Sequence, residues 1–242
     1  MTKRFGTAPI FSALDADIHA GSVTALVGPN ASGKTTLLRV LWGELKPEEG
    51  TIRWEGAPVD TASELWRRTV GAVPDDDALI EGLSIEDHFM LGGTLPGLTP
   101  TDIARRTGHL VELFGLEHAA ATTRSADEAS RGNRKRLACA LVLLGEPDII
   151  LMDEPYAGLD AERAVLLSTV LGVLAGRGRT VLFSCHDEGI TRSVADRFLM
   201  RGSTGAVTGP LDQLPDTRPG YMLSSYGSNG GTTAPDIVPW LR

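Results

Sequence analysis

The chain has 242 residues, 42% hydrophobic and 22% charged, a composition typical of a folded globular domain. Its formal net charge of −8 argues against nucleic acid as the main partner, so we expect no nucleic-acid binding. No apolar run is long enough to span a bilayer and no secretory signal is visible, so we expect a cytoplasmic protein. Its two cysteines, Cys139 and Cys185, then predict reduced core thiols rather than a disulfide or a metal site.

The first predicted elements surround a glycine-rich loop. Val23–Val27 predicts a buried strand, and Thr35–Trp42 has apolar residues at helical spacing. The loop between them fits the phosphate-binding pattern G-x-x-x-x-G-K-[ST]. Its N–H groups can surround phosphate oxygens, Lys34 can reach the β- and γ-phosphates, and Thr35 can bind Mg²⁺. The alternative is an accidental glycine turn. We expect ATP to bind at Gly28, Pro29, Asn30, Ala31, Ser32, Gly33, Lys34, Thr35 and Thr36.

The remaining elements alternate between strands and helices. The chain is β-rich up to about Pro74, apart from the helix after the loop, and a helical block runs from Ser84 to Leu144, opening on a capping box. Such alternation implies a parallel sheet. Residues 215–242 are rich in Gly, Ser, Thr and Pro and predict a surface tail. The further predicted strands are Thr51–Gly56 (with a turn), Thr69–Val73, Asp148–Met152 and Thr180–Ser184, and the further helices are Thr101–Phe114 and Ala161–Leu174.

Polar side chains follow two of these strands. Asp153 and Glu154 come directly after Asp148–Met152, and His186 follows Thr180–Ser184. Because parallel sheets bind ligands at the carboxyl ends of their strands, we expect Asp153 to hold Mg²⁺ through its water shell. Glu154 is placed to orient and deprotonate an attacking water, and His186 to contact the γ-phosphate. The alternatives are an acidic turn and a structural histidine.

The order of these features resembles the ATP-binding cassette (ABC) family, over nearly the whole chain from about Phe5 to Leu214. The resemblance implies an α/β phosphate-loop NTPase fold with a mostly parallel sheet and a small antiparallel β subdomain. It also implies an ATP-binding domain of residues 1–214 into which a helical subdomain of about residues 76–144 is inserted. Besides the phosphate loop, the resemblance rests on Ala129–Asn133, Leu151–Pro155, Ala157–Asp160, His186 and Asp196–Met200.

The resemblance also assigns roles to three residues outside the loop. In the family, two such domains enclose ATP head to tail, so Ser130 and Gly132 of one subunit would contact the nucleotide held by the other. Phe5 lies where an aromatic ring stacks on adenine. The alternatives are a core phenylalanine for Phe5 and a plain helix cap for Ser130.

Three positions depart from the family pattern. Ala31 replaces a usual glycine, which costs roughly 1 kcal/mol if the backbone there is left-handed. Arg131 stands where a residue without a side chain normally lets the backbone approach phosphate, so it either obstructs the partner's ATP or adds a charged contact to it. Asp75 replaces a glutamine; we expect it to be a third metal-binding residue, with a solvated acidic turn as the alternative.

These features predict the ATP-binding and ATP-hydrolysing subunit of an ABC transporter, with ATP and Mg²⁺ as its ligands. Its partners would be a second ABC subunit, in a homodimer or heterodimer, and a separate integral membrane permease. It would then be cytoplasmic and peripheral on the inner face of the membrane. The alternative is a soluble ABC-type ATPase or regulatory subunit acting on cytosolic proteins, which would carry the same ATP-site residues.

Overall fold

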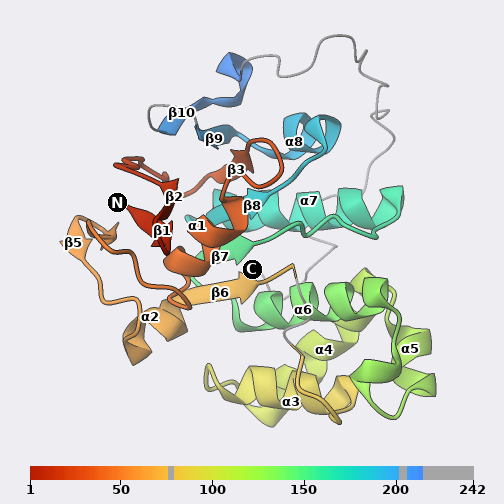
Figure 1. Cartoon of the computed structure of the whole chain (residues 1–242). Helices are drawn as coiled ribbons and strands as arrows, with labels where there is room; N and C mark the ends of the chain where they lie inside the picture. The colour runs from red at the N-terminus through yellow and green to blue at the C-terminus, as the bar shows by residue number, and fades with distance from the viewer. Residues whose placement is uncertain (76–78, 202–205, 215–242) are drawn as a thin grey trace.

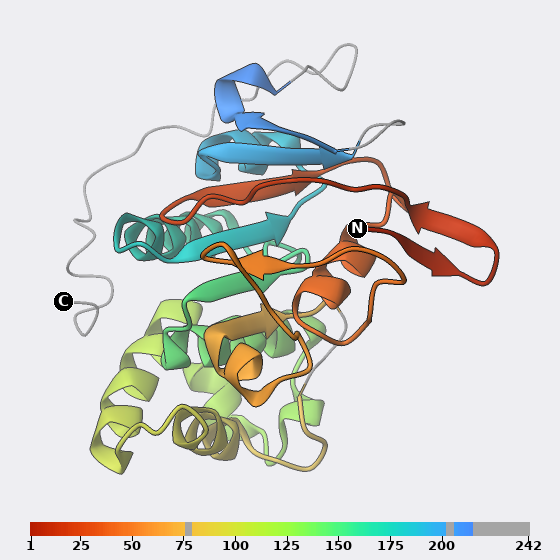
Figure 2. The same cartoon turned by 90° about the vertical axis from the view of Figure 1, so that its left-hand side faces the viewer.

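A six-stranded sheet forms the centre of the protein. The computed structural model describes residues 1–75, 79–201 and 206–214. The strand order is β10-β9-β3-β8-β7-β6, seen stacked from top to bottom in Figure 2. All neighbours are parallel except the edge strand β10, which is antiparallel to β9. The strands are β3 (Val23–Val27), β6 (Val70–Val73), β7 (Ile149–Met152), β8 (Thr180–Ser184), β9 (Arg197–Arg201) and β10 (Ala206–Pro210).

Both faces of this sheet are buried. Along β7, Ile150 and Met152 pack into one hydrophobic core, whereas Ile149 and Leu151 pack into the other. Successive side chains of a strand point to opposite faces, so a continuous apolar run is what a strand covered on both sides requires.

Different elements cover the two faces. One core is shared with α1 (Lys34–Leu41), α2 (Glu64–Thr69) and two small antiparallel sheets. The other is shared with α6 (Arg131–Gly145), α7 (Ala161–Gly176) and α8 (Glu188–Val194). The small sheets pair β1 (Lys3–Phe5) with β2 (Ala8–Phe11) and β4 (Arg53–Trp54) with β5 (Ala57–Pro58).

A block of helices lies between β6 and β7 in the chain and to one side of the sheet, at the bottom of Figure 1. The α3 helix begins at a capping box, in which Ser84 Oγ accepts from the N–H of Asp87 and the Asp87 carboxylate accepts from the N–H of Ser84. The α6 helix joins the block to the core, since it packs against α3, α4 and the strand β6. Before α6 the block comprises α3 (Ile85–Thr94), α4 (Pro100–Phe114), α5 (Glu117–Thr122) and a 3-10 turn, η1 (Ala126–Glu128).

The expected fold class is confirmed: a mostly parallel sheet, small antiparallel sheets and helices between its strands. Before Pro74 only the helix after the glycine loop was expected to interrupt the strands; this is wrong, because Ser63 caps a second, short helix, α2, directly before β6. Both cysteines are free and buried, as expected. The predicted tail lies outside the described residues, as do the first residues of the expected helical subdomain; the division into domains stays a prediction.

Candidate functional site

The loop after β3 turns sharply into α1. Gly33 is the N-cap of α1 and has φ +91°, a backbone conformation that glycine adopts without a steric penalty. A Cβ at Gly28 would lie 2.8 Å from Ser32 Oγ, so the two ends of the loop are in close contact. Lys34 Nζ donates hydrogen bonds to the carbonyls of Gly28, at 2.9 Å, and Pro29, at 3.2 Å. The ammonium is therefore held over the loop by the loop's own carbonyl oxygens.

Ala31 has φ +60° and is thus a left-handed non-glycine residue within this loop. Because the backbone at Ala31 is left-handed, alanine is unfavourable at this position, and its Cβ costs about 1 kcal/mol relative to glycine. The loop nevertheless keeps its compact form, since the Ser32 N–H donates to the Pro29 carbonyl at 3.2 Å.

Asp153 begins the segment after β7 and is almost fully buried, with 1% of its surface exposed. Its N–H donates to the Val73 carbonyl at 2.7 Å, and its Oδ1 accepts from the hydroxyl of Ser184. Its Oδ2 has no hydrogen-bond partner within the described part of the chain. A buried carboxylate oxygen without a partner is costly, which makes it a ready ligand for a cation.

Glu154 is paired with His186. Glu154 Oε2 lies 2.8 Å from His186 Nδ1, and because a carboxylate only accepts hydrogen bonds, the ring nitrogen donates. The imidazole is 65% exposed and the Glu154 side chain only 19%, so the pair links the buried end of β7 to the solvent-facing surface after β8.

The sheet topology explains why these residues meet. β8 lies between β3 and β7 and is parallel to both, so their carboxyl ends share one edge. The phosphate loop, Asp153 and His186 each follow one of these three strands. A cavity of about 450 Å³ at this edge is lined by Gly28, Pro29, Asn30 and His186, among others.

The donors at this edge fit a magnesium ion. They are oxygens, the preferred ligands of Mg²⁺: the unpartnered Oδ2 of Asp153 and the hydroxyl of Thr35 in the first turn of α1. Among the described residues, no cluster of three or more His, Cys, Asp or Glu side chains forms a ready metal site.

Asp75 lies beside two cations. Its Oδ1 is 3.8 Å from Lys135 Nζ and 3.9 Å from Arg131. Two of the three residues that depart from the family pattern, Asp75 and Arg131, therefore face each other. Its role as a metal ligand stays a prediction.

The residues assigned to the partner's nucleotide lie at the start of α6. Ser130 caps this helix, accepting from the N–H of Asn133 at 3.2 Å, and a Cβ at Gly132 would lie 3.4 Å from the Gly158 carbonyl. The predicted signature segment therefore touches the Ala157–Asp160 segment of the same chain.

Phe5 lies at the end of β1, and the residue is 54% exposed. The alternative of a core phenylalanine is wrong. An exposed ring is what stacking on a base requires, and Lys3 Nζ lies 5.6 Å from its centroid.

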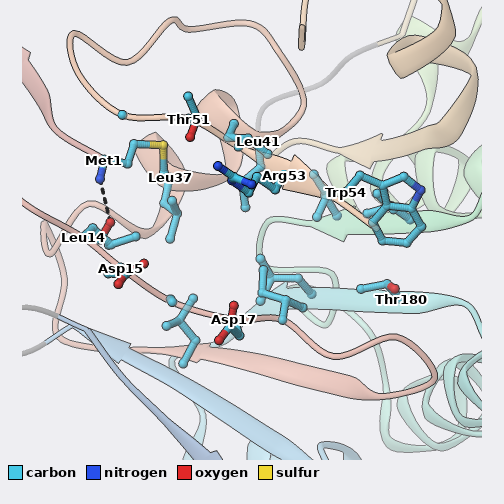
Figure 3. Close-up of a pocket in the computed structure, with 18 of the residues that line it drawn as sticks. Met1, Leu14, Asp15, Asp17, Leu37, Leu41, Thr51, Arg53, Trp54 and Thr180 are labelled. Carbon is cyan, nitrogen blue, oxygen red and sulfur yellow. Dashed lines mark hydrogen bonds between the residues drawn. The ribbon is translucent and has the colours of Figure 1, made fainter. Parts of the chain in front are cut away.

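A second cavity, of about 430 Å³, lies against the other side of α1, between the strands of the central sheet and the loop before β4 (Figure 3). It is lined mainly by apolar side chains such as Leu37, Leu41 and Trp66, with Asp15 and Asp17 along one wall. None of the predicted site residues lines it, so it is separate from the phosphate loop.

Two residues of the site escaped the sequence reasoning. Ser184 ends β8 and contacts both acids, and Lys135 in α6 donates to the carbonyl of Asp153. The local signal at Ser184 is a polar residue that ends an apolar run, and Lys135 is one of three consecutive basic residues. Neither pattern identifies the partner of its side chain.

The fold and site define a phosphate-loop nucleotide-binding protein. A family model described as ABC transporter matches residues 11–157, more than half of the chain. The Nod factor export ATP-binding protein I of Cupriavidus pinatubonensis is 35% identical over 239 residues, which cover 98% of this chain and 73% of that protein. The Fe(3+) ions import ATP-binding protein FbpC 1 of Rhodococcus jostii is 38% identical over 221 residues, which cover 89% of this chain and 62% of that protein. A solved structure described as the ATP-binding subunit of an ABC transporter has a TM-score of 0.78 at 25% identity, covering 87% of this chain and 88% of that one.

The chain therefore belongs to the ABC transporter family, which confirms the resemblance of its motifs. Within that family it is an ATP-binding subunit, an ATPase by class. Within the described ranges, none of the helices combines the length and apolar character needed to cross a membrane.

Proposed function

We propose that this chain binds Mg-ATP at the carboxyl edge of its sheet and hydrolyses it to power a separate membrane-embedded permease. The observation that carries this proposal is the arrangement around Asp153 and Glu154. The Asp153 carboxylate is buried, with one oxygen that has no partner among residues 1–75, 79–201 and 206–214, and the Glu154 carboxylate is paired with an exposed histidine. Both follow β7, in the same sheet whose strand β3 leads into the phosphate loop.

The proposed roles follow from these positions. Residues 28–36 surround the phosphates, and Lys34 exchanges the carbonyls of Gly28 and Pro29 for phosphate oxygens. Thr35 and Asp153 hold Mg²⁺, which supplies charge neutralisation between the phosphates. Phe5 stacks on the base.

Glu154 is the proposed general base. It orients a water and accepts its proton, and His186, released from Glu154, contacts the γ-phosphate. The hydrogen bond between them keeps both side chains at this edge of the sheet before the nucleotide is bound.

Binding is tested by replacing Lys34. We expect Lys34→Ala to abolish saturable binding of a fluorescent ATP analogue, whereas Lys46→Ala, at an exposed lysine, keeps it. Equal binding by both variants and the wild type would refute the assignment of the loop.

The subunit's partners are also proposals. Ser130 and Gly132 would contact ATP held by a second ABC subunit, in a homodimer or a heterodimer. A permease is supported by exposed apolar side chains around α3, namely Ile80, Met90, Leu91 and Leu95. The chain would then act in the cytoplasm, on the inner face of the membrane. The related proteins are named for export in one case and import in another, so they favour no direction of transport.

Co-purification after mild detergent extraction tests the permease. An integral membrane protein that co-purifies with the chain, and is lost when Met90 and Leu91 are both replaced by Ser, supports the proposal. Recovery of a cytosolic protein partner alone would favour the alternative of a soluble ABC-type ATPase.

A further inference from the structure

Ser184 lies between the two acidic residues of the site. It is the last residue of β8, and its surface is fully buried. Its hydroxyl donates to Asp153 Oδ1 and accepts from the N–H of Glu154 at 2.9 Å. Asp153 and Glu154 are adjacent in the chain and directly follow β7, the strand beside β8, so the serine reaches both across the carboxyl edge of the sheet.

We propose that Ser184 is a positioning residue of the nucleotide site, whose hydroxyl fixes the orientation of the Asp153 carboxylate toward the magnesium ion and holds Glu154 in place as the base. This inference rests on the proposed function.

The first part of the argument concerns Asp153. A hydroxyl has one hydrogen to donate, and Ser184 gives it to Oδ1. The main chain of Asp153 is fixed separately, through its N–H to Val73 and its carbonyl from Lys135. With these three contacts made, Oδ2 is the carboxylate oxygen that has no hydrogen-bond partner among the residues that the structure describes. Ser184 thus sets the orientation of the carboxylate about its last torsion.

The second part concerns Glu154, which has φ +49°. A left-handed conformation is unfavourable for a residue with a Cβ and persists only where surrounding contacts maintain it. The hydrogen bond from its N–H to Ser184 Oγ is such a contact. In this conformation the Glu154 carboxylate reaches His186 Nδ1, at 2.8 Å.

Burial makes the hydroxyl hard to replace. Because Ser184 is fully buried, its loss in Ser184→Ala would leave Asp153 with two unpartnered oxygens and the Glu154 N–H without an acceptor. The Asp153 carboxylate would then be free to rotate, and the position of Glu154 relative to Asp153 would no longer be fixed by a shared hydroxyl.

The decisive experiment compares thermal unfolding in ADP with EDTA and in ADP with Mg²⁺. In the wild type, Mg²⁺ should raise the Tm beyond the value in ADP alone. In Ser184→Ala this additional rise should largely disappear while the rise caused by ADP alone remains. The apparent Mg²⁺ affinity should fall by about 10- to 100-fold, the range for residues that orient a metal ligand. Ser184→Thr, which keeps the hydroxyl, should recover most of it.

Thr180→Val is the matched control. Thr180 starts the same strand, is also buried and loses a hydroxyl in a nearly isosteric change, but it lies at the opposite end of β8. It should keep the full Mg²⁺-dependent rise. If Ser184→Ala does not fold, Ser184→Cys, whose thiol is a poorer donor, takes its place with the same expected loss.

A Mg²⁺-dependent rise in Ser184→Ala, or in its Cys replacement, equal to that of the wild type would overturn the inference. A wild-type protein that responds neither to ADP nor to Mg²⁺ would instead refute the proposed function.

Discussion

Lys135 Nζ donates a hydrogen bond to the main-chain carbonyl of Asp153, at 2.5 Å, from a helix 18 positions earlier in the chain. The same ammonium donates to the Pro74 carbonyl at 2.8 Å, and the residue is only 6% exposed. A cation on α6 thereby joins the carboxyl ends of β6 and β7. Since α6 begins at the predicted signature segment, this contact connects that segment to the acidic pair.

Replacing Lys135 by Met should destabilise the protein. The change leaves two carbonyls near the strand ends without their donor, at a cost of about 1–3 kcal/mol in the free energy of unfolding. Urea denaturation measures this loss. Lys46→Met, at an exposed lysine, is the control and should stay within about 0.5 kcal/mol of the wild type. Equal midpoints for the two variants would show that the Lys135 contacts contribute nothing.

Replacing Glu154 by Gln should stop turnover but not binding. Loss of a general base lowers kcat by about 10²–10⁴-fold, whereas the phosphate loop is untouched. Phosphate release measures the rate, and size-exclusion chromatography with ATP should show the variant as a dimer, alone or with its partner subunit. Unchanged turnover would remove Glu154 from the role of base.

Replacing Arg131 by Gly should raise the ATPase activity of the assembled dimer. The Arg131 side chain is 78% exposed and 3.9 Å from Asp75, in a segment expected to approach the partner's phosphates. Steady-state ATPase assays at several protein concentrations measure the effect. A fall in activity would show instead that the Arg131 side chain makes a favourable charged contact with the phosphates of the partner's ATP.

Replacing Ala31 by Gly should stabilise the protein by about 1 kcal/mol, because glycine accepts φ +60° without the penalty that alanine incurs. Ala104→Gly, at an exposed position inside α4, should have the opposite sign and cost about 1 kcal/mol. Thermal or urea unfolding compares the two. A destabilised Ala31→Gly variant would show that the left-handed backbone at Ala31 does not lower the stability of the protein.

Both thiols should be unreactive in the native protein. Burial raises the pKa of Cys139 to about 12 and that of Cys185 to about 11, from an ordinary value of 9.0. At pH 8 very little thiolate is present, so a disulfide reagent should react slowly until guanidinium unfolds the chain, and then with two thiols per chain. Rapid modification at native pH 8 would contradict the buried positions.

The same shifts give the sign of a pH effect. The unfolded chain ionises its thiols at the ordinary pKa, whereas the folded chain holds them protonated. Their contribution to stability is therefore complete below pH 9 and is lost as the pH rises toward the folded values. Replacing both cysteines by Ala should flatten this part of the stability–pH curve.

The sequence by itself determined the features that depend on neighbouring residues. The strand Val23–Val27, the glycine loop after it and the capping box at Ser84 were predictable because a strand, a turn and a cap each follow from a few adjacent side chains. The strand Thr180–Ser184 matches β8 residue for residue, since a continuous apolar run is sufficient to define a doubly covered strand. The helix α2 was missed because its six residues are too few for a clear helical period.

Only the tertiary structure decided how the polar residues pair. Ser184 contacts Asp153 from 31 positions away in the chain, and Lys135 contacts Asp153 from 18 positions away. Asp75 meets Arg131 across the ends of β6 and α6. These contacts depend on the parallel register of β6, β7 and β8 and on where α6 packs, which no local pattern encodes. A buried polar group needs a hydrogen-bond partner. Which residue becomes that partner depends on how the whole domain packs, and this packing results from many weak interactions.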